Sequence, residues 1–250
     1  MNNKNNESLP EPLYVSFVES LYENRGVLIF GFIAQPLVAL AIAESTGNSV
    51  FKLLGVAFLL IGLIRLETSI AFAKVSATLK DRAEAQTWES LYLYTTSIAA
   101  FAMGIQCYFA VVSGDNFAEF AAMALLMATM VTIVGKNFAS RRLVLVATVL
   151  MMAPVFVAFV TEGDWKHLLA AALLVPFSLS ILSMSTYVRD FLRAAVLGNI
   201  ENKAIADRFD VAVNNMTHGL IMFDKDNKAT VVNKRAKEMI RTSGVTRVTG

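Results

Sequence analysis

Six apolar runs dominate this 250-residue sequence, and each approaches the length needed to cross a lipid bilayer as a helix. They occupy residues 27–43, 50–70, 91–112, 117–134, 143–160 and 168–187. A spanning helix needs roughly 20 mainly apolar residues and satisfies its own backbone hydrogen bonds. Of all residues, 56% are hydrophobic and only 17% are charged, against about 25% charged in soluble domains. The sequence therefore predicts an all-α integral membrane protein with a six-helix transmembrane bundle.

Lys and Arg gather at alternate ends of these runs. One set of ends carries Lys4, Arg25, Lys74, Lys80, Arg82, Lys136, Arg141, Arg142, Arg189 and Arg193. The other set carries Lys52 and Lys166 among acidic residues. Because Lys- and Arg-rich loops stay in the cytoplasm, we expect a multi-pass protein of the bacterial inner membrane with both termini cytoplasmic. The polar links at residues 45–48, 113–116 and 161–165 then face outward as tight turns.

The sequence contains no familiar catalytic or metal-binding motif. Cys107 is the single cysteine, which excludes an intramolecular disulfide and a thiolate cluster. His167 and His218 are predicted on opposite sides of the membrane, so they cannot share a metal or a haem. There is no glycine-rich phosphate loop, nucleophile elbow or HExxH helix, and a net charge of +2 gives no reason to expect a nucleic-acid partner. We therefore expect no catalytic residue, no metal and no evident cofactor here.

Polar residues within the runs are the first candidates for sensing. Arg65 and Glu67 stand near the inner end of the second run, and ionisable residues at membrane depth are costly enough to mark functional sites. The alternative is anchoring at the headgroups, which Arg65 can reach by extending its side chain. Gln35 and Pro36 stand together in the first run. Pro36 is expected to bend its helix, either as a hinge or as ordinary packing.

The inner link, residues 71–89, lacks Pro and Gly and is rich in helix-forming residues. The second and third spans are therefore expected to extend past the headgroups and to meet at a brief turn. Trp88 and Tyr92, four residues apart, share a helical face, as aromatic residues of a membrane interface do.

The combination of Arg65, a basic link, Trp88 with Glu89, then Tyr92 and a mid-span Gly104 resembles the six-span sensory regions of bacterial signalling proteins, notably GGDEF and EAL proteins. The resemblance covers roughly residues 25–190. It implies that Arg65, Trp88 and Glu89 take part in sensing, although anchoring at the interface explains the same residues.

Residues 188–210 continue without proline after the last run and are expected to form a helix that leaves the membrane. Leu197, Ile200, Ala204 and Val211 approximate the apolar seam of a coiled coil, with Asp207 interrupting it. The sequence therefore predicts a signalling helix that pairs in a homodimer.

The last residues alternate apolar and polar segments in an order typical of a helix, a hairpin and a second helix. Residues 219–224 and 229–233 are predicted strands, residues 224–228 a turn, and Asn233 the N-cap of a helix. This order resembles the beginning of PAS domains in alphaproteobacterial GGDEF/EAL proteins and some histidine kinases. The residues that carry the resemblance are Phe209, Asn214, Asn215, Met216, Gly219, Met222, Phe223, Asp224 and Asn233. His218 stands where that pattern commonly has Gln, so we assign it no phosphoacceptor role.

A PAS fold needs on the order of 100 residues, and about 40 follow the predicted signalling helix, so this PAS domain is expected to be incomplete and its hairpin poorly packed. The predicted division is a cytoplasmic leader at 1–24, a six-span sensory domain at 25–188, a signalling helix at 189–210 and the beginning of a PAS domain at 211–250.

The resemblance implies a region that passes a signal to the PAS domain and to a downstream cytoplasmic output, such as a diguanylate cyclase or phosphodiesterase. Two alternatives stay open. One is the sensor region of a histidine kinase, which would look the same at this end. The other is a small transporter or channel with a regulatory tail, although the sequence lacks the internal repeats that transporters usually carry.

Overall fold

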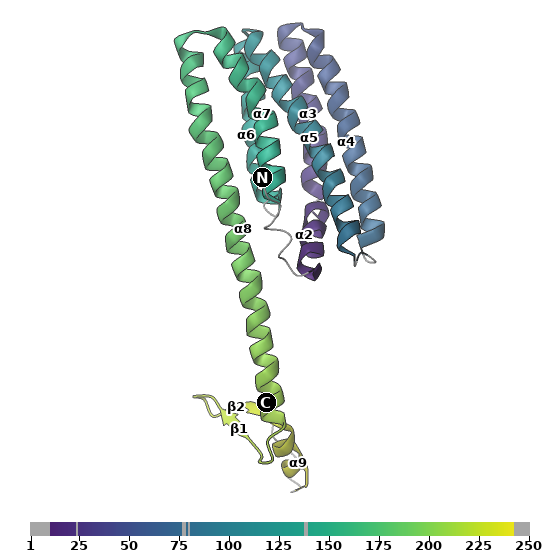
Figure 1. Ribbon diagram of the computed structural model, residues 1–250, viewed down its shortest axis with the longest axis vertical. Helices are drawn as coiled ribbons and strands as arrows, with labels where there is room; N and C mark the ends of the chain where they lie inside the picture. The colour runs from purple at the N-terminus through teal and green to yellow at the C-terminus, as the bar shows by residue number, and fades with distance from the viewer. Residues whose placement is uncertain (1–10, 24, 77–78, 80, 138–139, 243–250) are drawn as a thin grey trace. The chain divides into compact units, whose positions relative to one another are not determined.

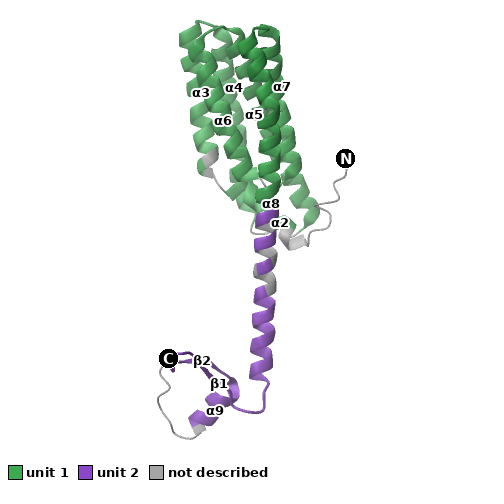
Figure 2. Cartoon of the chain, turned by 90° about the vertical axis from the view of Figure 1, so that its left-hand side faces the viewer, with its two compact units in different colours: residues 1–189 green, residues 190–250 purple. Residues whose placement is uncertain are grey.

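The computed structural model describes residues 11–242 except 24, 77–78, 80 and 138–139. Within that range the chain is mainly helical (Figure 1). The long helices are α2 (Glu11–Glu23), α3 (Arg25–Thr46), α4 (Ser49–Val75), α5 (Arg82–Val112), α6 (Asn116–Asn137), α7 (Arg141–Glu162) and α8 (Trp165–Asn214). The chain divides into two compact units, residues 1–189 and 190–250 (Figure 2).

Six helices of the described chain are long and apolar enough to cross a membrane. The spans are Leu28–Thr46, Ser49–Val75, Arg82–Val112, Asn116–Asn137, Arg141–Glu162 and Trp165–Phe191. All six predicted runs are thereby confirmed as long apolar helices. The helices extend beyond the predicted limits because those limits followed the apolar residues, whereas the helices include polar residues at their ends.

The short links between helices are built by local capping. The side chain of Asn48 accepts a hydrogen bond from the backbone N–H of Val50 (3.0 Å) at the start of α4. Asp81 does the same for Ala83 (3.1 Å) at the start of α5. At the end of α7, Gly163 has a φ of 72°, a left-handed conformation that glycine adopts readily. These caps begin or end the helices at the turns predicted from the sequence.

Close backbone contact holds α5 against α7 in the centre of the bundle. A Cβ atom at Gly104 of α5 would lie 2.7 Å from the carbonyl oxygen of Leu150 and 2.8 Å from that of Met151. Small residues let membrane helices approach in this way. The neighbouring Gln106 and Cys107 are fully buried beside this contact.

The sixth span is far more exposed than α5 or α7. Only 11% of the residues in its most apolar stretch are buried, against 56% in α5 and 50% in α7. Ala171 is buried, while Leu173 and Leu179 are 60% and 62% exposed. The membrane part of α8 therefore contacts the bundle through a narrow face.

The second unit contains the end of α8, the strands β1 (Ile221–Phe223) and β2 (Ala229–Val232), and the helix α9 (Lys234–Thr242). The strands are antiparallel, with Ile221 opposite Val232 and Phe223 opposite Ala229. The predicted order of helix, hairpin and helix is confirmed, although β1 is shorter than expected. Two short strands do not establish a PAS fold, which stays a prediction.

The apolar side chains of the first strand are poorly covered, as predicted. Met222 is 47% exposed and Phe223 is 61% exposed. A two-stranded hairpin has no second layer to bury these side chains, so its order depends on polar contacts with α8 and α9.

Candidate functional site

A cavity of about 100 Å³ lies inside the bundle between α3, α4, α5 and α6. Its polar lining consists of Gln35, Arg65, Tyr92, Thr96, Thr129, Thr132, Lys136 and Asn137. The described lining includes two cationic side chains and no Asp or Glu. We call it the cationic cavity.

Arg65 reaches into the cationic cavity from α4. It lies ten residues before Val75, the end of that helix, which is about 15 Å along the axis at about 1.5 Å per residue. Its Nη2 atom donates a hydrogen bond to Oγ1 of Thr96 (3.2 Å), and its guanidinium carbon lies 5.7 Å from the ring centroid of Tyr92. No carboxylate in the described part of the chain forms an ion pair with Arg65.

Lys136 approaches the same aromatic ring from α6. Its Nζ atom lies 5.8 Å from the ring centroid of Tyr92, so two cations contact one ring through cation–π attraction. The hydroxyl of Tyr92 donates to Oδ1 of Asn137 (3.0 Å) and the side chain is only 4% exposed. Tyr92 is therefore a buried part of the cavity wall instead of an aromatic anchor facing the headgroups.

The helix α2 packs an aromatic cluster against Tyr92. The ring of Tyr22 stacks on Phe72 with centroids 4.1 Å apart and meets Tyr92 edge-on at 5.2 Å. The hydroxyl of Tyr22 donates to the backbone oxygen of Trp88 (2.9 Å). Burial raises the pKa of Tyr22 well above its usual range, so the hydroxyl stays protonated as a donor.

The sequence predicts a cytoplasmic leader over residues 1–24 and does not indicate the helix α2, which lies within it. Five of its described side chains are buried: Tyr14, Val15, Val18, Leu21 and Tyr22. Their spacing of one, three, three and one residues is the pattern of an amphipathic helix. This pattern is present in the sequence, but the apolar segment is short and lies among polar residues, so it does not stand out.

Glu89 joins α2 to the start of α7. Its Oε1 atom accepts from the hydroxyl of Ser140 (3.0 Å), and its Oε2 atom accepts from the hydroxyl of Tyr14. The guanidinium carbon of Arg82 lies 4.8 Å from the centroid of the Tyr14 ring. Burial first, and then the hydrogen bond to Glu89, raises the pKa of Tyr14. The group holds α2 in place beside the cationic cavity.

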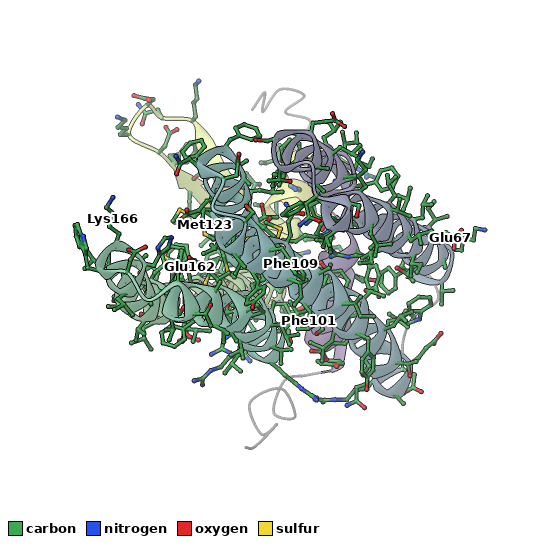
Figure 3. The ribbon with its side chains drawn as sticks, turned by 90° about the horizontal axis from the view of Figure 1, so that it is seen from above. Glu67, Phe101, Phe109, Met123, Glu162 and Lys166 are labelled. Carbon is green, nitrogen blue, oxygen red and sulfur yellow. The ribbon has the colours of Figure 1, made fainter. Side chains whose placement is uncertain are left out.

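The structure separates the predicted sensing residues into three places. Gln35, Arg65 and Tyr92 line the cationic cavity, and Pro36 is buried next to Gln35. Trp88 and Glu89 belong to the contact with α2. Glu67 lies at the rim of the bundle and points away from it (Figure 3), with an exposed side chain. Lys136 completes the cavity; in the sequence its only signal is that it marks the cytoplasmic end of a span.

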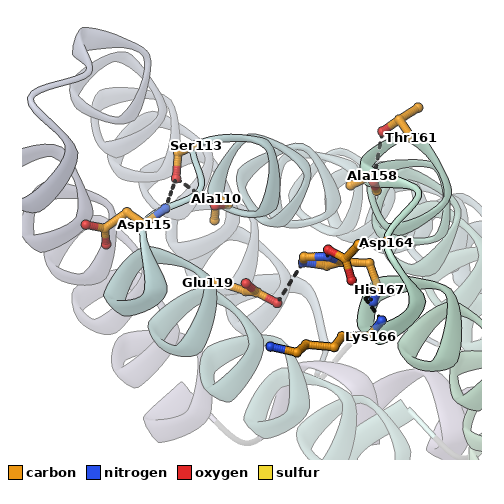
Figure 4. Close-up of polar contacts among 9 residues, drawn as sticks. All are labelled: Ala110, Ser113, Asp115, Glu119, Ala158, Thr161, Asp164, Lys166 and His167. Carbon is orange, nitrogen blue, oxygen red and sulfur yellow. Dashed lines mark hydrogen bonds and ion pairs between the residues drawn. The ribbon is translucent and has the colours of Figure 1, made fainter.

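At the other end of the bundle, His167 of α8 lies between two carboxylates (Figure 4). Its Nε2 atom is 3.7 Å from Oε1 of Glu119 in α6, and its Nδ1 atom contacts Oδ2 of Asp164. Oδ1 of Asp164 accepts from the backbone N–H groups of Lys166 (2.8 Å) and His167 (3.1 Å). These contacts lower the pKa of Asp164, the side-chain bond from His167 most. The described residues contain no group of three or more His, Cys, Asp or Glu able to hold a metal ion.

In the second unit, Asn233 is the centre of the polar contacts. Its Oδ1 atom accepts from the backbone N–H groups of Leu220 (2.9 Å) and Ala236 (2.8 Å). Its Nδ2 atom donates to the backbone oxygens of Val213 (3.0 Å) and His218 (2.9 Å). The predicted N-cap is confirmed, and the same side chain also joins α8, the hairpin and α9.

The other residues that carry the PAS resemblance have varied surroundings. Asn214 accepts a hydrogen bond from the backbone of Lys234 (2.9 Å), and Asp224 accepts two within its turn. A Cβ atom at Gly219 would lie 3.1 Å from the Cα atom of Ala236. The remaining side chains, Phe209, Asn215, Met216, Met222 and Phe223, are exposed.

The predicted dimer seam lies on the C-terminal half of α8. Ala204 is exposed and Val211 is 61% exposed. The side chains of Leu197 and Ile200 lie outside the described residues. Homodimer formation therefore stays a prediction.

Comparison of the chain with protein-family models, with curated proteins and with solved structures finds no match.

Proposed function

We propose that these residues form the membrane-embedded sensory and transmission region of a bacterial signalling protein. One observation carries the proposal: α8 is a single 50-residue helix in which a 27-residue span continues without a break as residues 192–214. A continuous helix can pass an axial shift or a rotation along its length, because its backbone hydrogen bonds resist local unwinding.

The bundle supplies what such a transmitter requires. A stimulus shifts a conformational equilibrium only if it binds two states with different affinity. The cationic cavity offers a site for binding, and the narrow contact face of the sixth span leaves that span free to change its position. The proposed movement is a small shift or rotation of α8.

The receiving part is the hairpin with α9, which we propose to be the beginning of a PAS domain ahead of a cytoplasmic output. Cyclic di-GMP turnover by GGDEF and EAL domains is the output that the resemblance favours, and a histidine kinase output is the alternative. In either case the signalling unit is a homodimer in the inner membrane, and the chain described has no catalytic role of its own.

Crosslinking along α8 tests this function. In a Cys107→Ala background, we expect Ala204→Cys and Val211→Cys to form disulfides between subunits in membranes. They lie seven residues apart and therefore on the same face of a coiled coil. Ala206→Cys, about 200° away from Ala204 around the helix at about 100° per residue, is the matched control and should crosslink weakly. If neither seam position ever crosslinks, the dimeric transmission mechanism fails.

A small anion transporter or channel is the second candidate, because two cations face a cavity inside the bundle. Purified protein in liposomes tests it directly. Phosphate or chloride flux that Arg65→Gln abolishes would favour transport, whereas absence of flux together with α8 crosslinking favours signalling.

A further inference from the structure

We propose that the cationic cavity binds a phosphate group, carried either by inorganic phosphate or by the headgroup of an anionic phospholipid. Arg65 and Lys136 are the binding residues, from α4 and α6. The binding itself does not depend on the signalling function, but the ligand's role as a stimulus rests on that proposed function.

Charge is the first argument. Arg65 and Lys136 contact the same Tyr92 ring, so two positive charges lie near one another inside a bundle of low polarity. Like charges repel more strongly where the dielectric constant is low, and cationic side chains at membrane depth commonly mark a ligand or ion pathway. The described lining of the cavity contains no carboxylate, and Arg65 forms no ion pair with a carboxylate of the described residues. An anion in the cavity would neutralise the charge of Arg65.

Hydrogen-bonding capacity is the second argument. A guanidinium group has five N–H donors in a planar fork, which fits the oxygens of a phosphate. Arg65 donates a side-chain hydrogen bond to Thr96, and its guanidinium carbon lies 5.7 Å from the centroid of the Tyr92 ring. Further donors therefore stay available for a ligand. Lys136 adds a compact charge, which is how lysine commonly binds phosphate.

The position of the cavity is the third argument. Lys136 is the penultimate residue of α6, and Arg65 lies ten residues inside the end of α4. The cavity therefore reaches from the level of the headgroups, where phosphate is abundant, into the bundle. A phosphate held there would touch the wall that Tyr92 shares with Tyr22 of α2. Ligand binding would thus act on α2 as well as on the spanning helices.

Binding measurements on the purified full chain in an uncharged, phosphate-free detergent test the proposal. The two probes are inorganic phosphate at constant ionic strength and short-chain phosphatidylglycerol. We expect one probe to raise the unfolding temperature along a saturable binding curve, and which probe does so identifies the source of the phosphate group. Arg65→Gln should weaken the binding about 10- to 100-fold, since a charge-assisted hydrogen bond is lost.

Lys74→Gln is the matched control, because it removes an equal charge from an exposed position on the same helix. Its affinity for the probe should stay within about twofold of the original. Lys136→Gln provides a second variant if Arg65→Gln does not fold. The proposal is overturned if neither probe binds, or if the cavity variants and Lys74→Gln lose affinity equally. Crosslinking of α8 without phosphate binding would overturn this inference alone and leave the signalling function standing.

Discussion

Replacement of Asn233 by Ala is the sharpest structural test in the second unit. The side chain is 1% exposed and forms four hydrogen bonds, two accepted and two donated. They connect the end of α8, the segment before β1 and the first turn of α9. The apolar side chains of β1 are exposed, so we expect this polar centre to supply much of the order of the hairpin.

The magnitude follows from the count of bonds. A hydrogen bond contributes about 0.5–1.5 kcal/mol net, so four bonds give roughly 2–6 kcal/mol. Leu220 is partly exposed, so water can replace its hydrogen bond. The expected loss of local stability is therefore about 3 kcal/mol. Since about 1.4 kcal/mol is a factor of ten, local opening should become about 100-fold more frequent.

Hydrogen exchange of the full chain in detergent measures this opening. The backbone N–H groups of Leu220 and Ala236 should exchange about 100-fold faster in Asn233→Ala, or reach the unprotected rate. Asn233→Asp keeps the accepted bonds and loses the donated ones, so its exchange should be intermediate. Asn215→Ala removes an exposed asparagine of the same unit and serves as the control. If Asn233→Ala accelerates exchange no more than Asn215→Ala, Asn233 does not organise the hairpin.

Two further predictions concern the bundle. Gly104→Ala places a Cβ atom against the backbone of α7 and should lower the unfolding free energy by about 1–3 kcal/mol. Gly135→Ala, which has open space around it, should leave the unfolding free energy unchanged. Thermal unfolding in detergent compares the two variants, and equal stabilities would disprove the close contact. Asp164 has a lowered pKa in the folded chain. Its stabilising contacts are therefore complete above about pH 4, the pKa of an aspartate in the unfolded chain. They disappear as the pH falls through the lower pKa of the folded chain. Exchange at the backbone N–H groups of Lys166 and His167 should therefore accelerate in acid beyond its intrinsic pH dependence, and Asp164→Asn should remove this excess; an excess that persists in the variant would refute the assignment.

The helices and turns follow from local physical requirements. A spanning segment must satisfy its own backbone hydrogen bonds, so apolar length alone indicated the six long helices. Turn and cap residues act within a few positions of themselves, which is why the link before α4 and the N-cap Asn233 could be read from the sequence. The turn between the two strands, in which Asp224 accepts two backbone hydrogen bonds, is local in the same way.

The candidate site depended on contacts that no local pattern contains. Arg65, Tyr92 and Lys136 come from three helices, and each is one of several polar residues near a helix end. Which of them face one another depends on the rotation of each helix about its axis, and packing between helices sets that rotation. For the same reason Glu67, two residues from Arg65, points away from the cavity.

By itself, the sequence determined six apolar helices, the short turns between them, and a helix, hairpin and helix at the end, because these depend on apolar length and on hydrogen bonds between near neighbours. Only the tertiary structure decided that α2 packs on Trp88 and Tyr92, that Arg65 and Lys136 share one ring, and that Asn233 joins three elements. These contacts link residues far apart in the chain, and their formation depends on how the side chains of several helices fill common space.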